Sequence, residues 1–309
     1  MPAATRTPDA TRRGFALGLA AYGMWGLFPL YWPLLEPAGA VEILAHRVVW
    51  SLVVMAVLVV ALRRTAQLRA TVADRRTRTI LVGAALLITL NWGTYIWGVN
   101  NEHVVETSLG YFINPLVTVL MGVFLLGERL RRLQWVAIGI AGVAVLGLAV
   151  EYGRPPWIAL VLAFSFAGYG LSKKKAGAGA VESLVVETTV TAPVALGYLL
   201  WLGASGASHF TSAGTGHALL LATTGLVTAI PLICFGGAAT RVSMTTIGLM
   251  QYVTPTIQFA IGVFFYGEPM PPMRWVGFGL VWVALALFTV ESLRHRRRTL
   301  RLTAEAVAA

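Results

Sequence analysis

Residues 122–136 read GVFLLGERLRRLQWV, and residues 262–276, 140 positions later, read GVFFYGEPMPPMRWV. The same register of 140 pairs Pro115 with Pro255. A period this long exceeds the unit of any solenoid, so it indicates that a half-molecule has been duplicated. The other features of the chain can be placed relative to these two copies.

Apolar residues make up 57% of the chain and charged residues only 12%, whereas roughly a quarter of the residues in soluble domains are charged. Apolar runs of about 20 residues recur, and each is long enough to cross a hydrocarbon core of ~30 Å. The predicted spans are 14–35, 40–62, 79–100, 106–126, 133–150, 156–172, 182–202, 217–239, 245–266 and 274–292. The sequence therefore predicts an all-α membrane protein with ten transmembrane helices.

The basic residues are distributed unevenly between the predicted loops. If both termini lie on one side of the membrane, that side holds nearly all of the 24 Lys and Arg residues. This asymmetry is typical of the positive-inside rule and predicts that both termini are cytoplasmic. The net charge of +11 then needs no nucleic-acid partner, and the basic C-tail (293–309) is expected to face anionic membrane lipid.

Each copy of the repeat contains five predicted spans. The copies occupy residues 14–150 and 155–292, between an N-tail (1–13) and the C-tail. Because five is odd, the second copy enters the membrane upside down, which gives two inverted five-helix repeats about an axis in the membrane plane. Inverted halves can rock about a shared central site, and this favours transport.

Several kinds of cofactor chemistry have no support in the sequence. Cys234 is the single cysteine, so neither a disulfide framework nor a thiolate metal site can be built. No pair of histidines has zinc-ligand spacing, and no Gly-rich loop ends in Lys-Ser or Lys-Thr as an ATP site would. We expect neither a metal nor a cofactor.

Two opposite charges fall at equivalent positions of the repeat, Arg47 in the second span and Glu187 in the seventh. Either charge facing lipid would cost about 2.5–3.5 kcal/mol, so both should face the interior. They could form a structural ion pair between these spans, or line one pathway as an anion-attracting and a protonatable group. His46 is next to Arg47 and one helical turn from Glu42, so a Glu42–His46 contact is possible; His46 could pack or relay protons.

Three prolines within predicted spans are candidates for helix breaks: Pro115, Pro255 and Pro231. A proline cannot donate to the carbonyl four residues earlier, so Tyr111 and Gln251 would lose their helical partners. Helix breaks at corresponding positions of two halves indicate a binding site. The alternative is that the prolines only bend helices for packing.

Amide and aromatic side chains could line the same site. Such a lining suits a mid-sized, partly apolar solute, although each residue could equally join helices together. The candidates are Asn91, Tyr95, Tyr111, Asn114, Tyr169, Gln251 and Tyr252.

Some of these residues belong to recognisable motifs. Residues 91–100 read NWGTYIWGVN and residues 106–117 read ETSLGYFINPLV. With these motifs the chain resembles the RarD group of the EamA family, within the drug/metabolite transporter superfamily, over essentially all of 14–292. The resemblance implies a ten-helix protein of the bacterial inner membrane, built of two EamA repeats. It also implies a relation to exporters of amino acids, metabolites or drugs that do not hydrolyse ATP.

The leading hypothesis is secondary transport of a small organic solute by alternating access, as efflux or exchange, with protons as a possible coupling ion. The alternatives are a passive channel or a non-transporting membrane partner protein, and less favourably a membrane enzyme. The one cluster that an enzyme could use is His103 with Glu102 and Glu106. Faces of small residues could serve internal packing or a homodimer.

Overall fold

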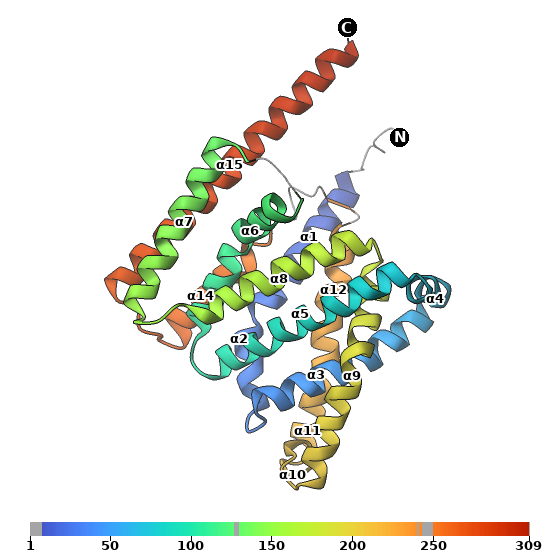
Figure 1. The fold of residues 1–309 in the computed structure, drawn as a ribbon. Coiled ribbons are helices and arrows are strands. Elements are labelled where there is room, and N and C mark those ends of the chain that lie inside the picture. The colour runs from blue at the N-terminus through green and yellow to red at the C-terminus, as the bar shows by residue number, and fades with distance from the viewer. Residues whose placement is uncertain (1–7, 127–129, 240, 243–249, 309) are drawn as a thin grey trace.

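The computed structural model describes residues 8–126, 130–239, 241–242 and 250–308, and within these residues all regular structure is helical (Figure 1). The predicted all-α class is therefore confirmed for the described part of the chain. Gly127 and Glu128 of the repeated motif lie outside the described residues. So do most of the predicted N-tail and residues 245–249, the predicted start of the ninth span.

The first half of the chain contains seven α-helices and one 3-10 helix among its described residues. They are α1 (Pro8–Gly26), α2 (Phe28–Tyr31), the 3-10 helix η1 (Trp32–Leu35), α3 (Ala40–Ala61), α4 (Thr65–Ala73), α5 (Arg75–Asn100), α6 (Val104–Leu126) and α7 (Arg132–Glu151). The short helix α4 lies where the sequence predicted only a loop.

The described part of the second half is also a series of helices, one of them a short π-helix. They are α8 (Trp157–Ala176), α9 (Ala180–Ala204), α10 (His209–Ser212), α11 (Thr215–Ala222), α12 (Thr224–Ala239), α14 (Val253–Ala260), the π-helix η2 (Ile261–Phe265) and α15 (Pro272–Ala308). Three pairs of helices begin 140 residues apart: α3 and α9, α5 and α11, and α7 and α15.

Seven helical segments in the described ranges are long and apolar enough to cross a membrane. Five are α3, α5, α6, α7 and α9; the sixth is 215–238, which joins α11 to α12, and the seventh is the first part of α15. Two shorter apolar helices lie within α8 and across α14 and η2. The total of ten spans and the inverted relation of the halves remain predictions.

The helix ends have ordinary chemical causes. The carboxylate of Asp74 accepts hydrogen bonds from the backbone N–H groups of Thr77 (3.1 Å) and Arg76 (3.3 Å), and so caps the N-terminus of α5. The bonds to Thr77 and then Arg76 lower the pKa of Asp74. At the C-terminus of α8, Gly177 adopts a left-handed conformation (φ 63°) that ends the helix.

The prolines affect the helices less than expected. Both α6 and α12 continue through Pro115 and Pro231, so no interruption occurs at these two positions. A proline removes one backbone hydrogen bond, and a helix supported by its neighbours can tolerate that loss. Near Pro255, residues 251–252 form a turn, and α14 begins at Val253, which places Pro255 in its first turn.

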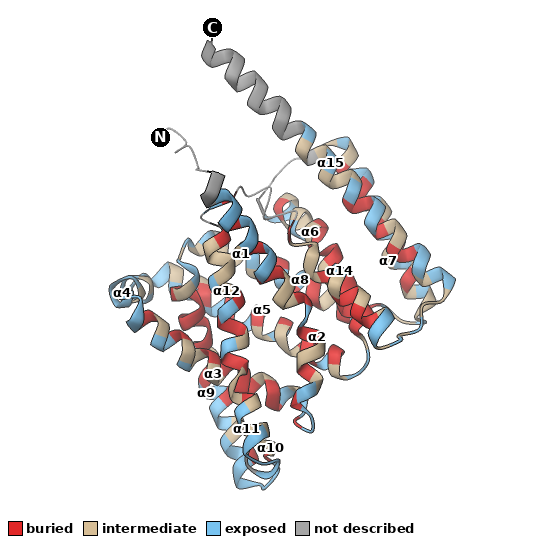
Figure 2. Ribbon diagram, turned by 180° about the vertical axis from the view of Figure 1, so that it is seen from behind, coloured by how far each residue is buried: buried red, intermediate tan, exposed pale blue. Residues whose placement is uncertain are grey.

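The buried residues lie on the sides of the helices that face other helices (Figure 2). In Figure 1, α7 and α15 lie side by side at one edge, and α6, α8 and α14 lie between that pair and the rest. One apolar core joins α6, α7, α8, α14 and α15, and a second surrounds η1 with parts of α3, α5 and α11.

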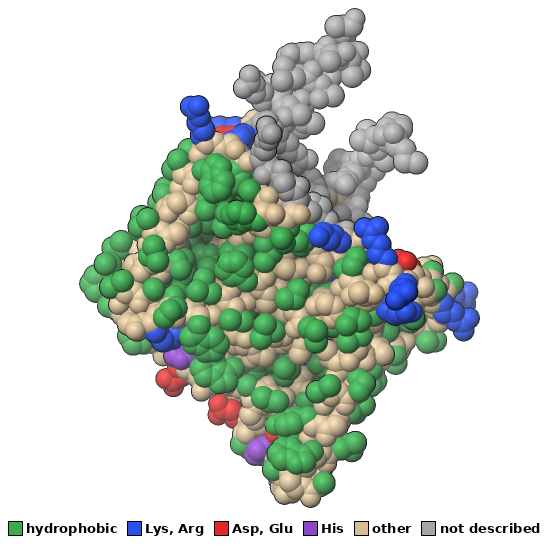
Figure 3. Space-filling view, viewed as in Figure 1, with side chains coloured by type: hydrophobic (Ala, Val, Ile, Leu, Met, Phe, Trp, Pro, Cys, Tyr) green, Lys and Arg blue, Asp and Glu red, His purple; other side chains and the backbone are tan. Residues whose placement is uncertain are grey.

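The outer surface of the helices is apolar. Large side chains are exposed, including Val150 (78%), Val194 (78%) and Phe264 (79%). Figure 3 shows hydrophobic side chains over the middle of the molecule, basic side chains near the chain ends and α4, and acidic and histidine side chains at the opposite edge. We name these two edges the basic face and the acidic face. An apolar belt between two polar faces is the surface that a lipid bilayer requires.

Candidate functional site

Arg47 lies on α3 and is buried, with 4% of its surface exposed. Its Nε donates a hydrogen bond to Thr228 Oγ1 on α12 (3.1 Å). Its guanidinium carbon is 3.9 Å from the ring centroid of Trp92, 5.0 Å from Trp32 and 5.8 Å from Phe28. No carboxylate in the described part of the chain forms an ion pair with Arg47. Aromatic faces therefore stabilise this charge in place of an acid.

Glu187 has a different cation from the one that the sequence suggested. It is 1% exposed on α9, accepts a hydrogen bond from Lys173 Nζ (2.8 Å) and another from the Tyr169 hydroxyl (3.0 Å). The possible Arg47–Glu187 ion pair is thus not formed in this conformation. The predicted span 156–172 ends just before Lys173, but α8 extends to Ala176 and carries Lys173 into reach of Glu187.

The possible contact between Glu42 and His46 is also replaced by another. Glu42 accepts a hydrogen bond from the backbone N–H of His209 (2.8 Å), and its second oxygen is 2.7 Å from His209 Nδ1. His46 stacks on Phe210, with ring centroids 4.8 Å apart. Both histidine environments therefore depend on α10, a short helix that has no strong sequence signal.

The buried amides join helices together. Asn91 Nδ2 donates to the carbonyl of Leu162 and to Ser165 Oγ (both 3.0 Å), and its Oδ1 accepts from the Tyr111 hydroxyl (3.2 Å). Asn114 Nδ2 donates to the carbonyl of Ala163 (3.0 Å). These bonds tie α5 and α6 to α8, which supports the interpretation of both asparagines as links between helices.

The remaining candidates divide between two places. Tyr95 packs edge-on against Tyr111, with centroids 5.6 Å apart, and both tyrosines interact electrostatically with Arg47. Gln251 and Tyr252 lie instead in the turn before α14, where Tyr252 packs against the core of α6, α7, α8 and α15. The structure thus groups Arg47 with Tyr95, Tyr111 and Asn91, groups Glu187 with Tyr169, and leaves 251–252 apart.

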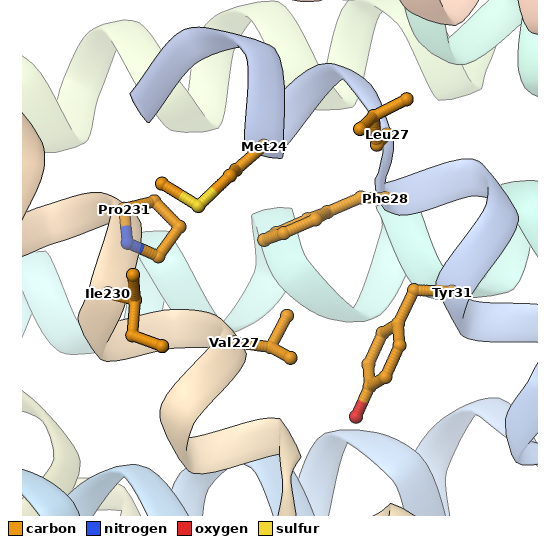
Figure 4. Close-up of a pocket in the computed structure, with 7 residues that line it drawn as sticks. All are labelled: Met24, Leu27, Phe28, Tyr31, Val227, Ile230 and Pro231. Atoms are coloured by element: carbon orange, nitrogen blue, oxygen red, sulfur yellow. The ribbon is translucent and has the colours of Figure 1, made fainter. Parts of the chain in front are cut away.

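An apolar groove of about 220 Å³ lies beside the Arg47 group (Figure 4). Its lining comes from the α1–α2 segment on one side and α12 on the other. The lining residues are Met24, Leu27, Phe28, Tyr31, Val227, Ile230 and Pro231. Phe28 belongs to both the groove and the aromatic surroundings of Arg47, so the two features are continuous.

At the acidic face, carboxylates form hydrogen bonds that join different helices. Glu268 accepts hydrogen bonds from the backbone N–H groups of Val104 and Val105 (3.0 Å for Val105), the first two residues of α6. Burial raises the pKa of Glu268 to about 7, against the opposing effect of these two bonds. Arg274 binds both oxygens of Glu151 (3.0 Å each).

Glu106 completes this face with a partner from the α7–α8 loop. It pairs with Arg154 (2.8 Å) and accepts from the backbone N–H of Ile158 (3.1 Å). The hydrogen bond to Glu106 raises the pKa of Arg154. The predicted cluster of His103, Glu102 and Glu106 therefore loses Glu106 to an ion pair, and no three His, Cys, Asp or Glu side chains gather as a metal site in the described ranges.

Sequence reasoning identified Arg47 and Glu187 but missed most of their neighbours. Lys173, Thr228 and His209 carry little signal on their own, because an ordinary Lys, Thr or His also fits a loop or helix surface. Trp92 and Trp32 could have been found as partners, since both lie in predicted spans near Arg47. The sequence, however, could not say which side of each helix they occupy.

Comparisons with known proteins identify relatives of this chain. Residues 12–150 match the model of the EamA-like transporter family. The chain is 60% identical to Protein RarD of Streptomyces exfoliatus, over 98% of this chain and 96% of that protein. It is 44% identical to Protein RarD of Escherichia coli K12, over 94% and 98%, and 43% identical to the uncharacterized transporter YojE of Bacillus subtilis, over 93% and 97%.

This chain has the same fold as another protein whose crystal structure has been solved. It is 18% identical to this chain, with a TM-score of 0.57, and the match covers 91% of this chain and 98% of that one. At this identity the likeness concerns the fold alone.

Proposed function

This chain belongs to the EamA-like transporter family, and we propose that it is a secondary transporter that carries a small organic solute by alternating access. It is a multi-pass membrane protein, with bacterial relatives. The proposal places it in the bacterial plasma membrane with both termini in the cytoplasm, and assigns it efflux or exchange.

The observation that carries this proposal is the symmetry of the contacts between helices. When the two halves are exchanged, the contact of α5 with α8 corresponds to that of α12 with α1, and α6 with α8 corresponds to α14 with α1. The contact of α3 with α12 likewise corresponds to α9 with α5, and the pairs α3–α9, α6–α14 and α7–α15 join equivalent helices. Such a pattern supports two repeats related by a twofold axis, the arrangement used by alternating-access carriers.

The bonds at the acidic face fit one closed state of such a carrier. Glu268 and Arg274 from the second half hold α6 and α7 of the first half. Tyr266 donates to the carbonyl of Pro29 (2.8 Å), and Glu42 holds α10. Opening this face would require these bonds between the halves to break together, while the buried charges stay between the halves.

A counterflow assay tests the proposal. Purified protein is reconstituted in vesicles preloaded with an unlabelled solute, and uptake of the same labelled solute is measured for a panel of amino acids, nucleosides and aromatic acids. A carrier accelerates uptake when solute is present on both sides. Uptake that never responds to solute on the opposite side would favour a channel, and no uptake of any compound would favour a non-transporting protein.

A further inference from the structure

Arg47 carries a buried charge between the helices. A buried charge is costly unless it is paired, and Arg47 has no carboxylate partner in the part of the chain that the structure describes. Its one hydrogen bond uses Nε, so the two terminal nitrogens Nη1 and Nη2 have no hydrogen-bond partner among the described residues. These nitrogens form the fork that binds a carboxylate through two parallel bonds.

Internal neutralisation by Glu187 is not available in this conformation. Both oxygens of Glu187 are already occupied, by Lys173 and Tyr169. Within the described ranges no carboxylate therefore remains for Arg47, and a bound anionic ligand would complement its charge.

The surroundings of Arg47 indicate the rest of the ligand. Trp92, Trp32 and Phe28 present ring faces to the guanidinium. Trp32 is fully buried and its indole Nε1, a hydrogen-bond donor, has no partner among the described residues. Flat rings beside a cation, with a spare N–H donor, suit an anion attached to a flat apolar body.

The adjoining groove sets the size of that body. Its volume of about 220 Å³ is below the roughly 300–1,000 Å³ of typical drug sites. Phe28 lines the groove (Figure 4), and its ring centroid is 5.8 Å from the guanidinium carbon of Arg47, so a ligand in the groove could direct a polar end toward the guanidinium. A single ring or a fused pair of rings fits this space better than a drug-sized molecule.

We infer that Arg47 and the rings of Trp92, Trp32 and Phe28 form the recognition site for a small aromatic carboxylate. This inference rests on the proposed transport function and names its substrate class. The carboxylate takes the free fork of Arg47, and the ring of the ligand takes the apolar groove between α1–α2 and α12.

The test measures binding to the purified full-length protein by ligand-induced thermal stabilisation and calorimetry. Four probes separate charge from ring: benzoate, benzamide, acetate and inorganic phosphate. Benzoate should stabilise the protein, whereas benzamide lacks the charge and acetate lacks the ring, so both should bind at least tenfold more weakly. Equal stabilisation by benzamide, or none by benzoate at millimolar concentration, would overturn the inference. Phosphate binding as tight as that of benzoate would overturn it too, in favour of a phosphate or lipid headgroup.

Variants then locate the site. Arg47→Lys keeps the charge and loses the fork, so benzoate affinity should fall about tenfold, and Trp92→Leu should weaken it about fivefold. Arg64→Gln removes a partly exposed arginine that pairs with Glu182 at the basic face, and should leave affinity within twofold. Unchanged benzoate affinity in folded Arg47→Lys protein would refute the site; if that variant does not fold, Trp92→Leu and the four probes decide.

Binding and transport can fail separately. Benzoate binding that depends on Arg47, without counterflow of any aromatic acid, would refute the transporter but keep the site. Counterflow of neutral solutes alone, with no benzoate binding, would keep the transporter and refute the anion site.

Discussion

Glu268 is the residue at which the acidic face should respond to pH. Burial raises the pKa of its carboxyl from 4.5 to about 7 in the folded protein. An acid with a raised pKa binds its proton more tightly in the folded state. The resulting stabilisation is therefore fully present below pH about 4.5 and is lost as the pH rises through about 7. The same sign holds for opening of this face, because an exposed Glu268 would regain its ordinary pKa.

We predict that the melting temperature of the wild-type protein, measured against Glu268→Gln, falls between pH 5 and pH 7 and then levels off. Glutamine cannot titrate, so the difference between the two proteins isolates this group. Glu36→Gln is the matched control, because Glu36 is an exposed carboxylate before α3 and is not among the groups that shift the pKa of Glu268. A difference that stays constant with pH, or a control that behaves like Glu268→Gln, would contradict the assignment.

Glu187 and Lys173 form the second residue-scale test. Removing one partner leaves the other charge without compensation, which costs about 3–5 kcal/mol for fully buried pairs. Lys173 has 22% of its side chain exposed, so we expect roughly 2–4 kcal/mol for Glu187→Gln. The double variant with Lys173→Met should recover most of that stability, measured by thermal unfolding, because both charges are gone.

Transport by the same variants separates structure from coupling. If Glu187 carries protons, a pH gradient across vesicles accelerates uptake by the wild type but not by the stable double variant. Equal acceleration in both proteins would show that Glu187 is only structural.

The sequence identified both buried charges at this scale but not their partners. Arg47 and Glu187 stand out because lipid-facing charges are costly, whatever their neighbours. Their partners depend on the rotation and length of other helices. Lys173 was assigned to a loop because the apolar run ends before it, and His209 belongs to a helix of only four residues.

The packing of α6 on α8 depends on a glycine. A side chain at Gly110 would place its Cβ 2.8 Å from the carbonyl oxygen of Ala159 and 2.9 Å from Leu162 Cβ. We predict that Gly110→Ala forces the helices apart and costs about 1–3 kcal/mol, seen as a fall of a few degrees in melting temperature. Gly170→Ala is the control on α8, since nothing lies within 4 Å of a Cβ there. Similar melting temperatures for the two variants would refute this close contact.

Elements were predictable where hydrophobicity alone defines them. All seven segments long enough to span a membrane coincide with predicted apolar runs, because length and composition are local properties. The helices α4 and α10 were missed since neither has an apolar run. The sequence could not predict that α6 and α12 continue through Pro115 and Pro231, because whether a helix continues past a proline depends on its neighbours.

At the scale of the whole molecule, the duplication could be detected from the sequence because identical residues recur 140 positions apart. The contact pattern between helices extends it, since the main contacts between the two halves have counterparts after the halves are exchanged. Side-chain pairing does not follow the symmetry: Glu42 and Glu182 are equivalent, yet one binds His209 and the other Arg64. Symmetry therefore predicts how the helices are arranged, but it does not predict which side chains pair at the two faces.

The inverted frame predicts the side of the membrane on which each loop lies. Cys234 is replaced by Ser, and single cysteines are introduced at Ala70, Lys175, Asn101 and Ser212, all exposed. A membrane-impermeant maleimide applied to intact cells should label positions 101 and 212, and should label 70 and 175 only after permeabilisation. Each face is thus sampled once in each half. Labelling of 70 and 175 on opposite sides would mean that five helices do not invert the second half, and the carrier mechanism would lose its symmetry.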